Sequence, residues 1–203
     1  MVIYRTSVSV PSISGAIVPS SSGLLAWQPS TWPEATAKWE SSLIPTLQKV
    51  FHESILAEID GVIADANEAN GGLEHRGYVI AIALMCALDA VSSYGYGARS
   101  GAQIPEFVRA HFPKEYRERA DELLTLYRHA LVHSWHLFQV AVRPGDDPVT
   151  TDENGALCFG LLHLRDAIFE GIADYFEKLE TDANLQSKTL ERYRDLRSTA
   201  RGI

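Results

Sequence analysis

Cysteine is scarce in this chain, which has only Cys86 and Cys158 among 203 residues. Two thiols are too few for a disulfide framework or for a cysteine-rich zinc site. Cys86 lies in an apolar run, and Cys158 stands next to Phe159. We therefore expect both to be buried, reduced thiols in a cytosol-like compartment.

Basic residues are also fewer than acidic ones. The chain has 18 Lys and Arg against 26 Asp and Glu, which gives a net charge of −8. No diffuse positive field exists to attract long nucleic acids, so any binding of RNA must depend on a local patch. Residues 144–182 carry ten acidic and two basic side chains, whereas residues 183–203 carry five basic and two acidic ones.

Long apolar segments are missing as well. The longest uninterrupted apolar run covers residues 78–88 and ends at Asp89, well short of the roughly 20 residues that span a bilayer. The first residues lack the charged start and the cleavage site of a signal peptide. We expect a cytoplasmic protein with no membrane partner.

The apolar pattern predicts one mainly α-helical domain. Residues 1–31 are rich in Ser, Pro and Gly, with Arg5 as their one charged residue, and are expected to form an extended N-terminal arm. Residues 32–203 are expected to form the domain. Pro45 lacks a backbone N–H and is expected to break or kink the first helical stretch, which divides it into two expected helices. The expected helices cover residues 33–43, 45–69, 73–93, 104–111, 114–140, 164–181 and 184–200. The helix over 73–93 is apolar nearly all round, which is typical of a buried central helix.

One region departs from the helical period. Residues 138–142 and 156–162 are short apolar runs on either side of a polar, turn-rich stretch, which predicts a β-hairpin or flap. The expected fold class is therefore all-α, a helical bundle with a small β-hairpin or flap insert.

The expected helix over 114–140 has two different faces. Arg128, His129, His133 and His136 interrupt its apolar pattern. Burying an unpaired cation is costly, so these side chains must face water, a partner or a cavity. The three histidines lie within about 60° of one another on a helix. The opposite face carries the core stripe Leu124, Tyr127, Leu131, Trp135 and Phe138.

The hexapeptide RHALVH at residues 128–133 resembles the Arg-polar-x-x-x-His motif of the HEPN superfamily. These are small helical-bundle proteins that include many ribonucleases of toxin and antiviral systems. The order of helices over residues 40–182 is also similar to that family. The arm over residues 1–31 and the loop over 143–157 are not accounted for by the resemblance.

The resemblance implies an RNA cleavage that needs no metal and no cofactor. His133 would be the general acid or base, and Arg128 would hold the scissile phosphate. His129, His136, Tyr127 and Asp89 would be supporting residues. The family context implies a toxin or defence system, with RNA or a nucleotide as ligand and an antitoxin-like protein as possible partner.

A homodimer is part of this expectation. A spacing of five residues places Arg128 and His133 about 140° apart on one helix. Members of the family usually bring the motifs of two chains together in one cleft. The nearly uncharged arm over residues 1–31 is a candidate to embrace a second chain.

Three other interpretations stay open. In the first, the chain is a non-catalytic interaction or scaffold domain. In the second, Arg128 is structural and pairs with Asp89 or Glu74. In the third, His129, His133 and His136 bind a metal ion such as Zn²⁺. No Glu follows His129, so the chain lacks the H-E-x-x-H motif of metalloproteases.

The last expected helix is basic. Arg194, Arg197 and Arg201 are three and four residues apart and share one face of that helix. They are candidates for phosphate binding, and the alternative is a solvated face in which Glu191 and Asp195 offset the charge.

Overall fold

The structure is a computed structural model, and it divides the chain into two units, residues 1–41 and residues 42–203, which are described separately. The predicted boundary after residue 31 stays a prediction. The structure describes residues 15–19, 25–29, 37–68, 72–97, 101–126, 140–143 and 147–201.

The first unit contains a two-stranded antiparallel ladder. Strand β1 (Gly15–Pro19) pairs with β2 (Leu25–Pro29), with Ile17 opposite Trp27. β-branched and aromatic side chains favour such a pairing, and the Ser- and Gly-rich stretch between the strands suits a connection. The segment expected to be an extended arm therefore includes a pair of strands.

The second unit begins within a long helical stretch. Helix α1 (Ala37–Val50) leads into the π-helical turns η1 (Phe51–Leu56) and then into α2 (Ala57–Glu68). The expected break at Pro45 is wrong, because α1 continues through it. Leu43 and Leu47 on either side of the proline are both buried. We attribute the continuity to this packing, which outweighs the hydrogen bond that a proline removes.

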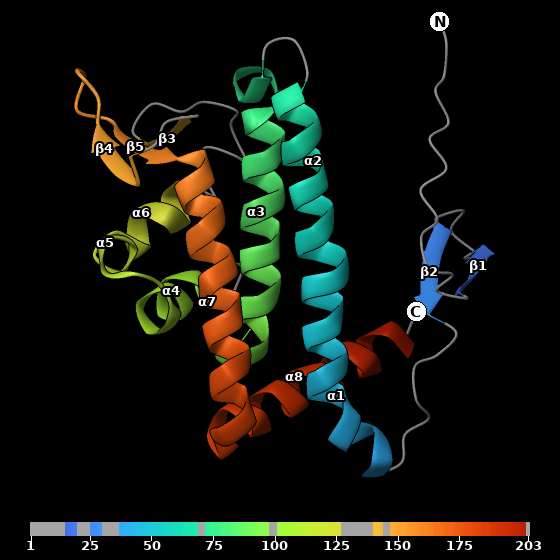
Figure 1. Cartoon of the computed structure of the whole chain (residues 1–203). Helices are drawn as coiled ribbons and strands as arrows, with labels where there is room; N and C mark the ends of the chain where they lie inside the picture. The colour runs from blue at the N-terminus through green and yellow to red at the C-terminus, as the bar shows by residue number, and fades with distance from the viewer. Residues whose placement is uncertain are drawn as a thin grey trace, which may run out of the picture. The chain divides into compact units, whose positions relative to one another are not determined.

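Helix α3 (Gly72–Tyr96) is the central element of the bundle and packs against α2, α4, α7 and α8 (Figure 1). Its side chains Leu84, Met85 and Leu88 are completely buried. Among the residues that the structure describes, the stretch Arg76–Tyr96 is the one long and apolar enough to cross a membrane, a property that core helices share.

The sequence predicts that this helix is buried nearly all round and that Cys86 is one of its buried residues. The prediction is wrong for one face of the helix. Val79 is 63 % exposed, and Cys86 and Ala90 are exposed as well. These three side chains lie on the side of α3 opposite the core residues. Cys158 is buried as expected, and neither cysteine forms a disulfide.

Three short helices cover one side of α3 and α7. They are α4 (Ile104–His111), α5 (Lys114–Arg117) and α6 (Ala120–Thr125). The single helix expected over 114–140 is therefore broken near its start, where Arg119 leaves the helical region with φ −118° and ψ 22°. Tyr116, Ala120 and Leu123 are buried on both sides of the break, so the apolar pattern continues across it and does not reveal it.

The β insert is a three-stranded sheet of β3 (Val140–Arg143), β4 (Val149–Thr151) and β5 (Leu157–Gly160), with β5 in the middle. Strands β4 and β5 form an antiparallel hairpin. Its turn is fixed by the Asp152 carboxylate, which accepts two backbone N–H hydrogen bonds at 2.9 and 2.8 Å, and by Gly155 with φ +80°. The two apolar runs on either side of the polar loop form strands β3 and β5. They pair with each other in parallel and not as the expected hairpin, because the antiparallel partner of β5 is β4.

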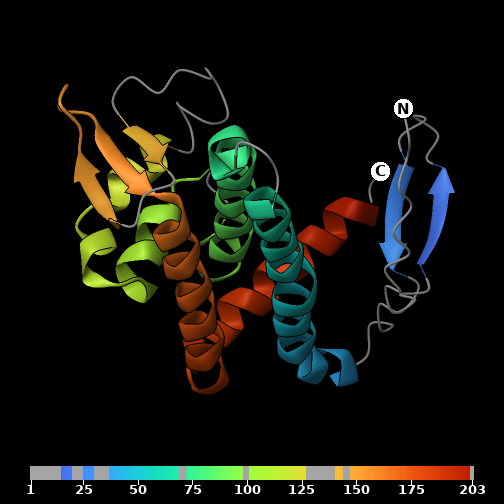
Figure 2. The same ribbon diagram turned by 45° about the horizontal axis from the view of Figure 1, so that its top comes forward.

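Two helices complete the chain, α7 (Leu161–Thr181) and α8 (Ala183–Arg201). Figures 1 and 2 show α8 crossing the lower ends of the bundle helices. The Asp182 carboxylate caps α8, accepting N–H hydrogen bonds from Asn184 and Leu185 at 2.9 and 3.0 Å. The expected fold class, mainly α-helical with a small β insert, is confirmed.

Candidate functional site

The segment that carries the Arg-x4-His motif, residues 127–139, lies outside the described residues. It is bracketed by Leu126, which is completely buried after α6, and by Val140, which begins β3. The expected catalytic residues Arg128 and His133 are thus not placed. The same holds for the expected supporting residues Tyr127, His129 and His136.

Asp89 is the one expected supporting residue that the structure describes. It is half-buried on α3, and its carboxylate accepts a hydrogen bond from Gln103 Nε2 at 2.6 Å. Gln103 is only 2 % exposed, so its amide is fixed by packing. Partial burial, and then the nearby Asp89 carboxylate, raise the pKa of Cys86. The Asp89 side chain is therefore held toward the start of α4.

The predicted basic stripe falls on one helix. Arg194 is exposed on α8, and Arg197 and Arg201 follow on the same helix, with side chains outside the described set. Their role in phosphate binding stays a prediction.

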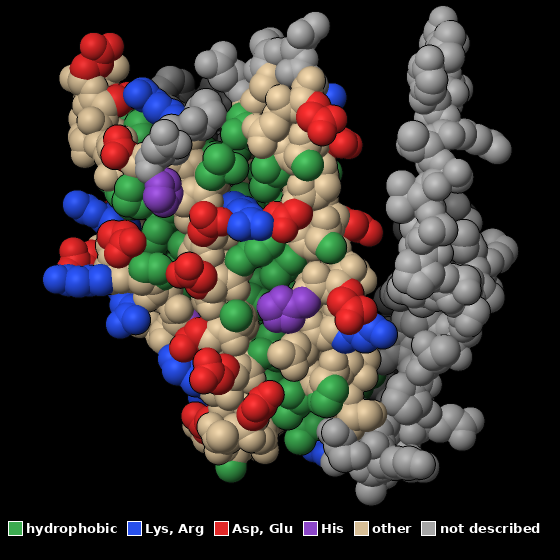
Figure 3. All heavy atoms as spheres, in the orientation of Figure 1, with side chains coloured by type: hydrophobic (Ala, Val, Ile, Leu, Met, Phe, Trp, Pro, Cys, Tyr) green, Lys and Arg blue, Asp and Glu red, His purple; other side chains and the backbone are tan. Residues whose placement is uncertain are grey.

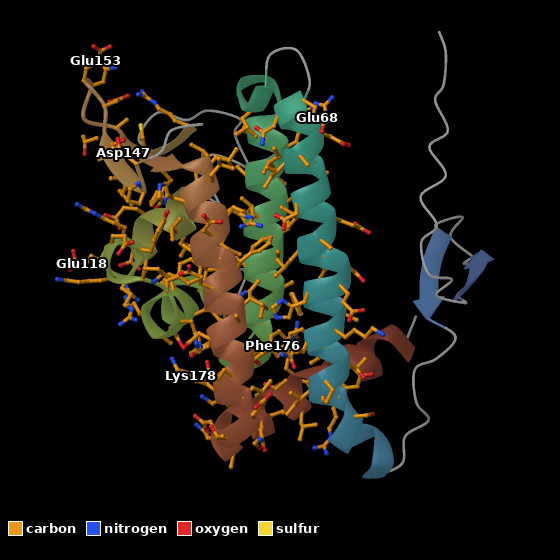
Figure 4. All side chains as sticks on the ribbon, viewed as in Figure 1. Glu68, Glu118, Asp147, Glu153, Phe176 and Lys178 are labelled. Carbon is orange, nitrogen blue, oxygen red and sulfur yellow. The ribbon has the colours of Figure 1, made fainter. Side chains whose placement is uncertain are left out.

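A polar network that the sequence did not predict joins three helices at His111. Nδ1 of His111 lies 2.6 Å from Asp174 Oδ2 on α7, and Nε2 lies 2.9 Å from the Tyr96 hydroxyl on α3. Lys178 donates to the same Asp174 oxygen at 2.7 Å and to the carbonyl of Ala110 at 3.0 Å. In Figure 4, Lys178 extends from α7 toward α4, and Phe176 extends toward the long helical stretch.

The protonation states in this network follow from burial. The His111 side chain is 2 % exposed, and burial lowers its pKa by more than the Asp174 hydrogen bond raises it. Burial also raises the pKa of Tyr96. The neutral imidazole therefore donates from Nδ1 to Asp174 and accepts from the Tyr96 hydroxyl at Nε2.

This arrangement resembles a catalytic base and its orienting carboxylate, but it is closed. The rings of Phe107, Tyr96 and Tyr175 pack around the imidazole at centroid distances of 4.6 to 5.8 Å. Both ring nitrogens are occupied, so no position is left for a reacting group. We interpret His111 as a structural connection between α3, α4 and α7.

We expect acid to destabilise the fold through this network. The folded-state pKa of His111 lies below its ordinary value of 6.5, so the unfolded chain gains this proton first as the pH falls. Stability is therefore lost from about pH 6.5 downward to the folded-state pKa. Partial burial opposes ionisation of Asp174, but hydrogen bonds from Lys178 and His111 outweigh it and lower the pKa of Asp174, which adds a loss of the same sign at lower pH.

Urea unfolding at a series of pH values tests this expectation. His111→Gln should cost about 1–3 kcal/mol near neutral pH, because it leaves buried partners unpaired. It should also flatten the pH dependence of the unfolding free energy between about pH 7 and pH 5. A variant that keeps the wild-type slope would show that His111 is not its source.

A second cross-link holds α7 to α2. Arg165 donates to both carboxylate oxygens of Asp60 at 2.7 Å, and to Asp166 at 2.5 Å. Its guanidinium lies 4.1 Å above the centre of the Phe169 ring. Bidentate pairing and stacking are the contacts in which Arg cannot be replaced by Lys. Arg165 therefore holds α7 and α2 together.

The face seen in Figure 3 is acidic over α2 and α7. The exposed carboxylates of these two helices are Glu58, Asp65, Glu68, Asp166, Glu170, Glu177 and Glu180. A surface of this sign repels a phosphate backbone and attracts basic groups.

Within the described part of the chain, no group of three or more His, Cys, Asp or Glu side chains is placed to hold a metal ion. The alternative metal site at His129, His133 and His136 falls outside that part and stays a hypothesis.

Comparison with known proteins adds no assignment. No family model, no curated protein and no solved structure matches this chain. The class that the fold defines is a mainly α-helical bundle with a three-stranded β insert.

Proposed function

We propose that this protein is an HEPN-like helical bundle that binds RNA and cleaves it without a metal ion, acting in a toxin or defence system. The observation that carries the proposal is the Arg128-x4-His133 motif within an otherwise apolar helical pattern. A mainly helical bundle is the setting that such a motif requires.

The rest of the described chain supports this choice of centre. Its best-formed titratable clusters, at His111 and Arg165, are closed by their own partners. Polar groups that do chemistry must instead have a position left for substrate. The imidazoles and the guanidinium of residues 127–139 are candidates for such groups.

The proposed reaction uses the 2′-hydroxyl of RNA as nucleophile. A neutral His133 imidazole takes the proton of that hydroxyl while its oxygen forms a bond to phosphorus. The bond from phosphorus to the 5′-oxygen breaks, and the leaving oxygen takes a proton from an imidazolium or from water. Arg128 binds the non-bridging phosphate oxygens through its planar fork. The products carry a 2′,3′-cyclic phosphate and a 5′-hydroxyl.

The acidic face over α2 and α7 favours a second candidate function. A non-catalytic interaction domain would present this face to a basic protein, such as an antitoxin-like partner. Long RNA would avoid the same face. The two candidates differ in whether the purified chain alone binds RNA.

Binding of single-stranded RNA at fixed salt tests the proposal and separates the two functions. Arg128→Ala should weaken binding at least tenfold, since a charge-assisted phosphate contact contributes about 1.5–3 kcal/mol. Arg109→Ala is the matched control, because Arg109 is an exposed arginine paired with Asp121 at 2.7 Å. It should bind RNA like wild type. No binding at all would favour the interaction domain, and equal affinity of the wild type and both variants would show that RNA binds without Arg128.

A further inference from the structure

We propose that Asn154, at the tip of the β4–β5 hairpin, is a site of covalent modification, where the side-chain amide is lost by spontaneous deamidation. The co-reactant is water, and the reaction needs no enzyme. The main product lengthens the backbone and opens the turn of the hairpin. This inference is independent of the proposed cleavage of RNA.

The residue that follows Asn154 in the chain is Gly155. In deamidation the nucleophile is the backbone nitrogen of the next residue, and glycine has no Cβ atom to crowd its approach. Both residues are exposed, and Glu153 beside them extends outward from the hairpin tip (Figure 4). Water therefore has access to the reacting atoms.

The fold holds the nucleophile by one exposed contact. Gly155 has φ +80°, and its N–H donates to the carbonyl oxygen of Asp152 at 3.0 Å. This hydrogen bond must open before the nitrogen can attack. The net contribution of one such bond is small, so its loss slows the reaction by about tenfold at most. The folded hairpin therefore delays deamidation of Asn154 and does not prevent it.

The reaction has two steps. The Gly155 nitrogen gives up its proton to the solvent and forms a bond to Cγ of Asn154, and Nδ2 takes up a proton and leaves as ammonia. The product is a five-membered cyclic imide. Water then adds to one of the two imide carbonyl carbons, and the bond from that carbon to the Gly155 nitrogen breaks. Opening at the side-chain carbonyl gives aspartate, and opening at the main-chain carbonyl gives isoaspartate.

Isoaspartate is the product that opens the turn, because it adds one carbon to the backbone within it. The carboxylate of Asp152 closes the turn by accepting the N–H groups of Asn154 and Ala156 at 2.9 and 2.8 Å. A longer backbone between these two groups moves Ala156 away from the carboxylate. The pair of Thr151 and Leu157 is next to the turn, so its register is no longer fixed by it.

The change stays local to the hairpin. Phe159 of β5 is completely buried and stacks on Tyr116, so β5 is anchored without the turn. Thr150 and Thr151 of β4 are exposed and have no such anchor. We therefore expect β4 to separate from β5 while the helical bundle stays folded.

Peptide mapping of the full chain by mass spectrometry, after storage at mildly alkaline pH, tests the modification. The peptide that contains Asn154 should gain the mass difference between an amide and an acid, and isoaspartyl methyltransferase should methylate part of it. Asn184 is the internal control, because the N–H of the next residue, Leu185, is held by Asp182 at the start of α8. It should keep its amide. Asn70 also precedes a glycine, and fragment spectra assign any change there separately.

Two variants separate the modification from its consequence. Asn154→Gln should keep its amide, because glutamine would have to form a six-membered ring, which closes far more slowly. Asn154→Asp carries the charge of the product without the longer backbone. In hydrogen exchange, the stored wild type should lose protection at the Ala156 amide by at least about tenfold, since a charge-assisted hydrogen bond is lost. Stored Asn154→Gln and fresh Asn154→Asp should keep that protection.

Two results would overturn the proposal. A synthetic peptide of residues 149–160 provides the unfolded reference in the same buffer. If Asn154 of the full chain keeps its amide for ten times as long as the peptide needs to lose it, the fold protects the site. If isoaspartate forms and the Ala156 amide stays protected, the modification does not open the turn.

Discussion

His133→Ala is expected to lower the rate of RNA cleavage by about 10²–10⁴, while folding and RNA affinity stay close to wild type. In the proposed mechanism, the substitution removes the group that moves a proton in the transition state. It leaves the Arg128 guanidinium, which is the proposed phosphate contact, in place. Single-turnover cleavage of a labelled RNA, measured beside equilibrium binding, separates the two effects.

His52→Ala is the matched control for this prediction. His52 is a half-exposed histidine on η1, next to Phe176 and remote in sequence from the motif. Its variant should cleave like wild type. Equal rates for His133→Ala and the wild type would remove His133 from the mechanism, and a His133→Ala chain that fails to fold would assign the residue to packing.

Gly171→Ala is expected to destabilise the fold by about 1–3 kcal/mol. A Cβ atom at Gly171 of α7 would lie 2.5 and 2.6 Å from two ring carbons of Phe112. Phe112 is completely buried and packs edge-on against Tyr116 and Phe107, so its ring has no room to move away. Urea unfolding monitored by circular dichroism measures the loss.

Gly61→Ala provides the opposite expectation in the same assay. Nothing lies within 4 Å of a Cβ atom at Gly61, which is exposed on α2. Alanine should therefore stabilise that helix by up to about 1 kcal/mol through helix propensity alone. Equal unfolding midpoints for the two variants would show that α7 is not packed against Phe112 as closely as described.

Apolar periodicity predicted the helices that pack one face against the core. The helix expected over 104–111 matches α4 at both ends, and that over 164–181 matches α7 within one turn. Both have their buried residues three and four positions apart. A regular apolar stripe is a local signal, so one sequence suffices to find it.

Other features depend on contacts that no local pattern contains. Helix α1 continues through Pro45 because Leu43 and Leu47 are buried on both sides of it. The parallel pairing of β3 with β5 depends on where β4 inserts. Exposure of Cys86 depends on which neighbours surround α3, since an apolar helix alone does not reveal its open face.

The candidate site also has a part that the sequence predicts and a part that it does not. The Arg128-x4-His133 motif can be found from sequence because its residues are local. The His111 network cannot, because Asp174 is 63 residues away and Tyr96 is 15 residues away. The histidine at the end of α4 can be assigned to this network only after the packing of α7 is known.

The decisive measurement for the proposed function is RNA cleavage by the metal-stripped full chain in excess EDTA. We expect cleavage to continue, its products to end in a 2′,3′-cyclic phosphate and a 5′-hydroxyl, and an RNA with a 2′-deoxy residue at the cleavage position to resist. Absence of cleavage would rule out the proposed reaction. Activity that EDTA abolishes and Zn²⁺ restores would also rule it out and would favour a metal site at His129, His133 and His136.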